Sequence, residues 1–473
     1  MPDWRDELLE RFSFPRYERT GRNATGWPGY TPAQVVRYGI GEIGGVKVVA
    51  CVWDFSAYGG SFGELDATAF AEACELAASY REPLVSFTRT GGTRLQEGNA
   101  ALVGIARSQL ALRRLAAAGV PHVAVVDHPT TGGVLVGVVS RADLRLAVEG
   151  ATIGFAGPRV VEAVTGRPLP EDSHTAASAR DAGVVDEVVT ADAVRERLGA
   201  VLALVRPDPG SAEVGPEPSG ESSYDDVALP ERDGAQQVAA ARALTGPSGT
   251  TLLDALLPGA AHVRAAGGDD TVTARLGRLG DATRVVAVAL AAAPGTRPTV
   301  GGYRVLVRAA ALAGRLGIPL VTLVDTPGAE PSAPSEAAGI GSAIADGFDA
   351  VLGCASPTVG VLVGEGGSGG ALAGLVADRV LVTPEGYLAA LGAEGAAVAL
   401  RVPVEVAADR LALRPADLLR LGLADRAVHG SDDVERLGAR LAAEVSALQA
   451  IDPAARRAQR ERRWSAPLPG SLA

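Results

Sequence analysis

Residues 361–373 read VLVGEGGSGGALA, an apolar strand that runs into paired glycines and then into a helix of small residues. Residues 123–134 read VAVVDHPTTGGV and repeat that order. A glycine turn that opens a helix leaves backbone N–H groups free, and the absence of Cβ lets a ligand approach the main chain. Two such turns, one in each half of the chain, indicate two α/β domains built on a similar design.

Short apolar strands alternate with helices around both turns, which is typical of helices packed outside sheets. In the first half we predict strands over Val46–Asp54, Leu84–Thr88 and His122–Asp127 and helices over about 64–79 and 98–118. In the second half we predict strands over Val285–Leu290, Leu320–Asp325 and Val359–Val363 and helices over about 303–316 and 335–348.

The two halves also resemble each other in detail. Residues 142–150 mirror residues 377–386 with one residue inserted, and Gly132-Gly133 mirrors Gly369-Gly370 at an offset of 237. The alternative is that any two α/β segments of this composition look alike. Because order, spacing and motif type agree, two homologous domains are the better interpretation.

Residues 206–234 are dominated by Pro, Gly, Ser and acidic residues and lack hydrophobic periodicity, which indicates a linker. We therefore predict an N-terminal domain over 1–205, a linker over 206–234 and a C-terminal domain over 235–473.

Composition excludes several classes of protein. The net charge of −11 argues against a nucleic-acid partner. Cys51, Cys74 and Cys354 form no C-x-x-C pair, so neither a zinc ribbon nor a disulfide framework is supported. No apolar stretch reaches the roughly 18 to 20 residues of a membrane helix, and the N-terminus shows no signal peptide. We expect a soluble cytoplasmic protein.

The glycine turns match neither phosphate-binding pattern, G-x-x-x-x-G-K-[ST] or G-x-G-x-x-G. Holding a developing oxyanion is the other use, where each donor contributes about 3 to 4 kcal/mol to transition-state stabilisation. The competing explanation is close packing of a helix on its strand. A third turn, Gly91-Gly92, ends the strand before the first pair, and Arg94 behind it either binds a phosphate or carboxylate or only packs.

At these residues the chain resembles a known family. Residues 90–98, 127–133 and 153–160 resemble the β subunit of bacterial acetyl-CoA carboxylase carboxyltransferase. Residues 302–304, 325–329 and 364–372 resemble its α subunit. The resemblance covers about residues 40–190 and 280–430, and the chain looks like the single-polypeptide β–α form of actinobacteria.

The resemblance implies an α/β fold with two crotonase-like (ClpP/crotonase) β-β-α superhelix domains in tandem. It also implies a head-to-tail homodimer, or a higher homo-oligomer, in which the β half of one chain faces the α half of the other. On the acyl-CoA side, Gly132 and Gly133, with help from Gly91 and Gly92, would hold the thioester oxygen and stabilise an enolate. Arg94 is the candidate CoA-binding side chain.

On the biotin side, Gly370 and Ala371 would donate N–H bonds to the ureido oxygen, with Gly369 binding beside them. The implied reaction moves CO2 from carboxybiotin on a carrier protein to the α-carbon of a short acyl-CoA, such as acetyl-CoA to malonyl-CoA in fatty acid biosynthesis. The ureido anion removes the α-proton, so no protein base is required. The implied partners are biotin carboxylase and the biotin carboxyl carrier protein, with no nucleic acid and no membrane.

Two features depart from the family. The four-cysteine zinc ribbon of the β subunit is absent, so we expect no metal, and residues 392–395 read GAEG where the α subunit usually reads SPEG. Two alternatives remain, a biotin-independent malonyl-thioester decarboxylase and a non-catalytic partner subunit. The C-terminal arginines, which are either a docking segment or part of a solvated helix, are Arg456, Arg457, Arg460, Arg462 and Arg463.

Overall fold

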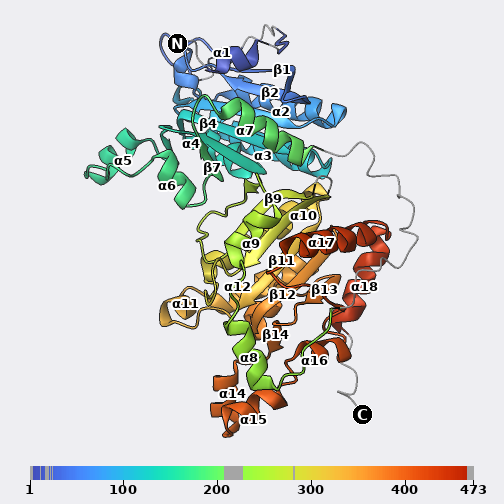
Figure 1. The fold of residues 1–473 in the computed structure, drawn as a ribbon. Helices are drawn as coiled ribbons and strands as arrows, with labels where there is room; N and C mark the ends of the chain where they lie inside the picture. Colours follow the sequence, from blue (N-terminus) through green and yellow to red (C-terminus); the bar gives the residue numbers. More distant parts are fainter. Residues whose placement is uncertain are drawn as a thin grey trace. The chain divides into compact units, whose positions relative to one another are not determined.

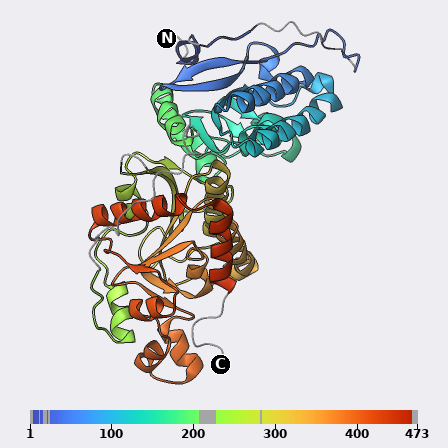
Figure 2. The same ribbon diagram turned by 90° about the vertical axis from the view of Figure 1, so that its right-hand side faces the viewer.

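The computed structural model describes residues 4–465 except 11, 16–20, 22, 24, 207–226 and 281–282. The chain divides into two compact units, Met1–Pro209 and Gly210–Ala473, each built around its own sheet (Figures 1 and 2). The predicted linker over 206–234 falls mostly outside the described residues, so the predicted domain boundaries stay a prediction.

The first unit contains a seven-stranded sheet in its described residues, in the order β1-β2-β3-β4-β5-β7, with β6 paired to β4. Its strands are β1 (Val36–Ile43), β2 (Val46–Trp53), β3 (Leu84–Thr90), β4 (His122–Thr131), β5 (Leu144–Val148), β6 (Ile153–Gly154) and β7 (Glu187–Val189). Its helices are α1 (Trp4–Leu9), α2 (Glu64–Tyr80), α3 (Asn99–Ala117), α4 (Gly132–Gly137), α5 (Pro158–Thr165), α6 (Ala176–Asp181) and α7 (Val194–Val205).

The second unit repeats this arrangement with an eight-stranded sheet in its described residues, in the order β15-β13-β12-β11-β10-β9-β8, with β14 paired to β12. Its strands are β8 (Ala261–His262), β9 (Thr273–Leu279), β10 (Thr283–Leu290), β11 (Leu320–Thr326), β12 (Thr358–Gly367), β13 (Arg379–Val382), β14 (Tyr387–Ala389) and β15 (Arg426–Ala427). Its helices are α8 (Gly234–Arg242), α9 (Gly249–Leu256), α10 (Val300–Leu316), α11 (Ala333–Ala337), α12 (Ile340–Leu352), α13 (Ser368–Leu372), α14 (Ala393–Leu400), α15 (Val404–Arg410), α16 (Pro415–Arg420), α17 (Val434–Gln449) and α18 (Pro453–Ser465).

Each sheet is parallel in its centre and begins with an antiparallel pair. β2 to β5 and β10 to β13 run parallel, whereas β1–β2 and β9–β10 are antiparallel. Gly44 and Gly45 join β1 to β2 with φ of 58° and 78°, which suits a tight hairpin. The sequence analysis missed β1 and β9. This architecture agrees with the crotonase-like fold class predicted for both domains.

Apolar side chains cover both faces of the sheets. In β2, Val49, Cys51 and Trp53 lie in a cluster with side chains of α2 and α3, and the alternating residues of the strand are buried as well. In the second unit one cluster joins α9, α17 and alternate residues of β10, β11 and β12. Both sheets are therefore central layers, and their turns project from the strand ends.

One predicted helix is wrong. Residues 335–348 form two helices, α11 and α12, because Gly339 has a φ of 86° and breaks the backbone between them. Glycine tolerates this left-handed conformation, and apolar periodicity does not reveal it.

The C-terminal arginines belong to α18, where Arg457 and Arg462 are exposed, as a solvated helix predicts, and two others are buried. Arg456 and Arg460 are 3% and 2% exposed. Arg460 forms a two-pronged ion pair with Asp378 (2.8 and 2.7 Å) and donates to the carbonyl groups of Val351 and Cys354. These two arginines hold the helix to the end of α12, to the segment that follows it and to Asp378, the residue before β13.

Candidate active site

Two turns touch at the carboxyl ends of β3 and β4 in the first unit. Gly92 has a φ of 108° and its N–H donates to Thr90 Oγ1 at 3.0 Å. A Cβ on Gly92 would lie 3.4 Å from the Cα of Gly132, so the predicted third turn lies against the first glycine pair. The N–H of Gly132 donates to the carbonyl oxygen of Phe155 at 2.8 Å.

Two backbone donors remain free where these turns meet. Among the described residues, the N–H groups of Gly133 and Thr93 have no hydrogen-bond acceptor. A Cβ on Gly133 would lie 2.6 Å from Thr93 Oγ1, which shows how closely the two residues approach. Free, preorganised N–H groups at one spot are what a developing oxyanion requires.

The structure therefore separates the predicted acyl-side residues. Gly91 donates its N–H to Gly59 (2.9 Å), and the donors of Gly92 and Gly132 are also engaged, so these three glycines shape the turns. Gly133 keeps a free donor. Thr93 was missed by the sequence analysis, because its contribution is a main-chain N–H and its side chain carries no signal.

The second unit builds the same arrangement at the ends of β11 and β12. Gly328 has a φ of 113°, and its N–H donates to Thr326 Oγ1 at 3.2 Å, as Gly92 donates to Thr90. Thr90 and Thr326 therefore occupy equivalent positions, 236 residues apart.

The register predicted between the two glycine pairs is wrong by one residue. Gly132 and Ser368 begin α4 and α13 with φ of 63° and 60°, and they are 236 residues apart. Gly132 thus corresponds to Ser368, and Gly133 corresponds to Gly369 instead of Gly370. The sequence misled because a serine occupies the left-handed position in the second turn, where the first has glycine.

The other predicted repeat holds. Asp143 accepts the N–H of His122, the first residue of β4, and Asp378 accepts that of Thr358, the first residue of β12. These aspartates are 235 residues apart, as the pairing of residues 142–150 with 377–386 predicted.

The predicted biotin-side residues lie together at the start of α13. In the part of the chain that the structure describes, the N–H groups of Gly369, Gly370 and Ala329 lack an acceptor. Ala371 is the fourth residue of α13, a position whose N–H bonds to the carbonyl group of the residue before the helix. A Cβ on Gly370 would lie 2.6 Å from Ala329 N, so Ala329 takes the place here that Thr93 takes in the first unit.

A buried tyrosine supports this turn from behind. Tyr303 is fully buried, and its hydroxyl donates to the carbonyl oxygen of Gly370 at 2.9 Å. Burial raises the pKa of Tyr303 well above its usual value, so the hydroxyl stays neutral and acts as a donor.

Arg94, predicted as a ligand-binding residue, is 0% exposed. Its guanidinium pairs with Asp66 at 3.0 Å and donates to Ser61 Oγ at 2.9 Å and to the carbonyl oxygen of Ala33 at 2.8 Å. This placement leaves no exposed donor for a CoA phosphate. Arg94 is instead placed to support the turn that contains Gly91 and Gly92.

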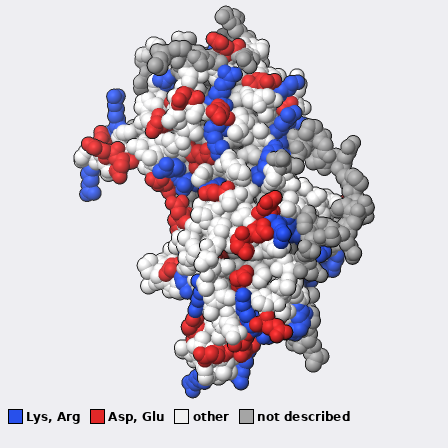
Figure 3. Space-filling model, in the orientation of Figure 1, with Lys and Arg blue, Asp and Glu red and all other residues white. Residues whose placement is uncertain are grey.

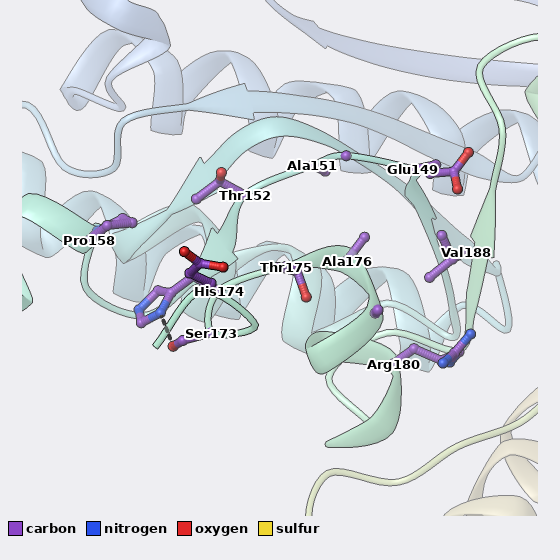
Figure 4. A pocket seen from close by; sticks show the side chains of 13 residues that line it. Glu149, Ala151, Thr152, Pro158, Ser173, His174, Thr175, Ala176, Arg180 and Val188 are labelled. Atoms are coloured by element: carbon purple, nitrogen blue, oxygen red, sulfur yellow. Dashed lines mark hydrogen bonds between the residues drawn. The ribbon is translucent and has the colours of Figure 1, made fainter. Parts of the chain in front are cut away.

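A pocket of about 410 Å³ lies elsewhere in the first unit, between the β5–β6 connection and α6 (Figure 4). His174 and Ser173 line it, with Ser173 Oγ 2.6 Å from His174 Nδ1, and Glu149 and Arg180 lie farther along the lining. The turn residues named above are absent from this lining, and no residue that lines it was predicted as a site residue.

Other site types are not apparent in the described residues. They contain no group of three or more His, Cys, Asp or Glu placed to hold a metal ion, and none of their helices has the length and apolar character to cross a bilayer. On the described part of the face drawn in Figure 3, basic and acidic side chains are interspersed, without an extended basic patch.

The glycine turns give a first testable prediction. Gly91→Ala should leave stability unchanged, because a Cβ there meets only the oxygen of Gly59 at 3.5 Å. Gly92→Ala should lower the free energy of unfolding by about 1 to 3 kcal/mol, because alanine is strained at a φ of 108°. Denaturant unfolding and acyl-CoA binding are measured for both variants. Equal free energies of unfolding and equal affinities would show that the backbone conformation at Gly92 is unimportant.

Solved structures place this fold in a class. A transcarboxylase 12S structure, described as a hexamer with hydrolysed methylmalonyl-CoA bound, matches with a TM-score of 0.75 and 23% identity, covering 93% of this chain and 89% of that one. A single-chain, multi-domain long-chain acyl-CoA carboxylase matches with a TM-score of 0.69 and 19% identity, covering 92% of this chain and 45% of that one. These likenesses confirm the predicted fold class, two crotonase-like units in one chain.

Sequence comparison gives the family. Residues 5–256 match the model of the carboxyl transferase domain, and residues 295–466 match that of acetyl co-enzyme A carboxylase carboxyltransferase-like proteins. The beta/alpha carboxyl transferase of acetyl-CoA carboxylase from Parafrankia sp. (strain EAN1pec) is 35% identical, over 95% of this chain and 80% of its own length. A probable biotin-dependent acyl-CoA carboxylase beta3 subunit from Mycobacterium tuberculosis is also 35% identical, over 96% and 92%. The chain belongs to the carboxyl transferase family and is a biotin-dependent acyl-CoA carboxyltransferase.

Proposed function

We propose that this enzyme transfers the carboxyl group of carboxybiotin, presented on a carrier protein, to the α-carbon of a short acyl-CoA, converting acetyl-CoA to malonyl-CoA. The observation that carries the proposal is the pair of equivalent turns, one per unit, each with free backbone donors beside a second turn. A transferase that handles two oxyanions, one on the acceptor and one on the donor, requires two such sites.

In the first unit, the N–H groups of Gly133 and Thr93 are proposed to bind the thioester oxygen and to stabilise the enolate. Gly91, Gly92 and Gly132 hold these donors in place through the turns. Removing one oxyanion donor typically costs an enzyme about 10²- to 10³-fold in kcat, so main-chain geometry of this kind is a large part of the expected catalysis.

In the second unit, the N–H groups of Gly369, Gly370 and Ala329 are proposed to bind the ureido oxygen. The reaction breaks the bond between the ureido nitrogen and the carboxyl carbon and releases CO2, and the electron pair stays on the ureido group. That anion takes the proton from the acyl α-carbon, and the resulting enolate forms the new carbon–carbon bond with CO2. The free donors of this turn favour transfer over a biotin-independent decarboxylase, which has no use for them.

Assembly as a homodimer, or a higher homo-oligomer, is part of the proposal. Phe155, Val160 and Val164, on and beside α5, are 73%, 57% and 80% exposed, and Val398 on α14 is 81% exposed. Apolar surface of this kind marks interaction sites. We propose that these surfaces join two chains, and that biotin carboxylase and the carrier protein bind the assembled enzyme in the cytoplasm, where it serves fatty acid biosynthesis.

The reverse reaction tests the function. Purified protein is incubated with malonyl-CoA, with and without biocytin, and acetyl-CoA is measured. We expect acetyl-CoA only when biocytin is present. Equal product without biocytin would replace the proposal with a decarboxylase. A reaction with methylmalonyl-CoA alone would keep the transferase and change the acceptor, and no reaction with either would favour a non-catalytic subunit.

A further inference from the structure

Helix α8 connects the biotin-side turn to a helical arm formed by α14 and α15. Its Val238 and Ala241 lie in one apolar cluster with Tyr387 of β14, Ala393 of α14 and Ala408 of α15. The contact is therefore continuous from the strand beside the turn, through α8, to both helices of the arm.

Arg242, in the last turn of α8, binds two carboxylates at once. Its Nε lies 3.0 Å from Glu365 Oε2, and its two terminal nitrogens lie 2.6 and 3.3 Å from the oxygens of Glu394. Glu394 is in the first turn of α14, and it pairs through the planar fork of the guanidinium, a geometry that lysine does not reproduce. Tyr387 donates its hydroxyl to the same Glu365 oxygen at 2.8 Å.

Glu365 ties this ion pair to the biotin-side turn. It is 8% exposed and lies in β12, two residues before Gly367. Its N–H donates to Asp325 Oδ1 at 2.8 Å, and Asp325 precedes the turn that contains Ala329. The main chain of Glu365 is thus held by one half of the biotin-side site, and its side chain by Arg242.

The arm carries exposed apolar side chains. Val398 and Leu400 of α14 are 81% and 53% exposed. At this end of the arm, Glu394 pairs with Arg242 of α8, and this half-exposed ion pair by itself contributes little energy. Glu365 makes the connection stronger, since an almost buried carboxylate without its cation is costly.

We propose that Arg242 is a positioning residue that fixes the arm against the biotin-side turn by binding Glu365 and Glu394 together. The proposal rests on the proposed function for its kinetic consequence, because the turn is the site assigned to the ureido group. A fixed arm keeps the N–H groups of α13 in position when another surface binds the exposed apolar side chains of the arm.

The test compares Arg242→Gln and Arg242→Lys with Arg414→Gln. Arg414 is the matched control, because it also pairs with a carboxylate (Asp417, 2.8 Å) at a similar side-chain exposure, 40% against 43%, in the same unit. We expect Arg242→Gln to raise the KM for biocytin about tenfold while the KM for acyl-CoA changes less than about twofold. Arg242→Lys should recover part of the loss, because an ammonium can pair with Glu365 without forking onto Glu394.

Hydrogen exchange supplies a second readout that needs no turnover. In Arg242→Gln, amides of α14 and α15 should exchange faster, while those of α17 should exchange as in the wild type. In Arg414→Gln, amides of α14 and α15 should also exchange as in the wild type. Unchanged exchange in the arm would overturn the proposal, and so would faster exchange with unchanged biocytin kinetics in an active enzyme. If the wild type shows no biocytin-dependent reaction, the proposed function fails and exchange alone decides whether Arg242 holds the arm.

Discussion

We expect the Gly370→Ala variant to lose about 10²- to 10³-fold of its biocytin-dependent activity, while Gly369→Ala retains it within about threefold. A Cβ on Gly370 would lie 2.6 Å from the backbone nitrogen of Ala329 and 2.8 Å from the hydroxyl of Tyr303, so the turn must shift. A Cβ on Gly369 would meet only a ring carbon of Phe348 at 3.9 Å, which is ordinary contact. The two variants therefore differ in geometry at almost the same place in the chain.

The measurement is acetyl-CoA formation from malonyl-CoA as a function of biocytin concentration. Acyl-CoA affinity and thermal unfolding are the controls, since the substitution lies in the second unit and should leave the first unit's turn intact. If Gly370→Ala keeps more than about a third of the activity, the backbone donors of α13 do not stabilise the transition state. Equal loss in Gly369→Ala would show that any side chain in this turn obstructs the donor.

The second large effect is on stability. Arg460→Ala should lower the free energy of unfolding of the second unit by about 3 to 5 kcal/mol, because it leaves the carboxylate of Asp378 buried without its principal cation. It also removes donors from the carbonyl groups of Val351 and Cys354. Arg456, 3.6 Å from Asp378, compensates only in part, and burial already lowers the pKa of Arg456 below its usual value.

Arg457→Ala is the matched control, because Arg457 is an exposed arginine in the same helix. Guanidinium chloride unfolding can be followed through Trp464, which is the only tryptophan after residue 53 and donates its indole N–H to Ala377 at 3.0 Å. We expect Arg457→Ala to change stability by less than about 0.5 kcal/mol. Similar values for both variants would mean that α18 contributes little to the second unit.

The strands, the glycine turns and the family resemblance were accessible from the sequence because their signals are local. An apolar strand such as β12 is recognisable from its own residues, and a glycine turn is visible as a pair of letters. Helix α10 and strands β3, β4 and β11 agree with the predicted ranges to within a few residues. Where the decisive residue was an isolated glycine in an apolar stretch, as at Gly339, the local pattern failed.

The chemistry of the site depended on contacts between distant segments. Thr93 and Gly133 are brought together only when β3 and β4 pair, and Ala329 meets Gly370 in the same way in the second unit. No pattern of side chains in a sequence predicts a free backbone donor. An N–H group is free only because the folded chain places no acceptor near it. The one-residue error in the register between the two glycine turns had the same origin. The positive φ of Ser368 marks it as the equivalent of Gly132, and residue type alone does not show this.

The arginines show the division most clearly. The sequence by itself determined two units with equivalent glycine turns, because those features follow from residue type and spacing, and its resemblance to a known family implied the carboxyltransferase activity. It could not determine whether Arg94, Arg242 or Arg460 faces a ligand, a neighbouring helix or solvent. Only the tertiary structure decided that, because the partner carboxylates Asp66, Glu365 and Asp378 lie 28, 123 and 82 residues away along the chain and become neighbours through packing.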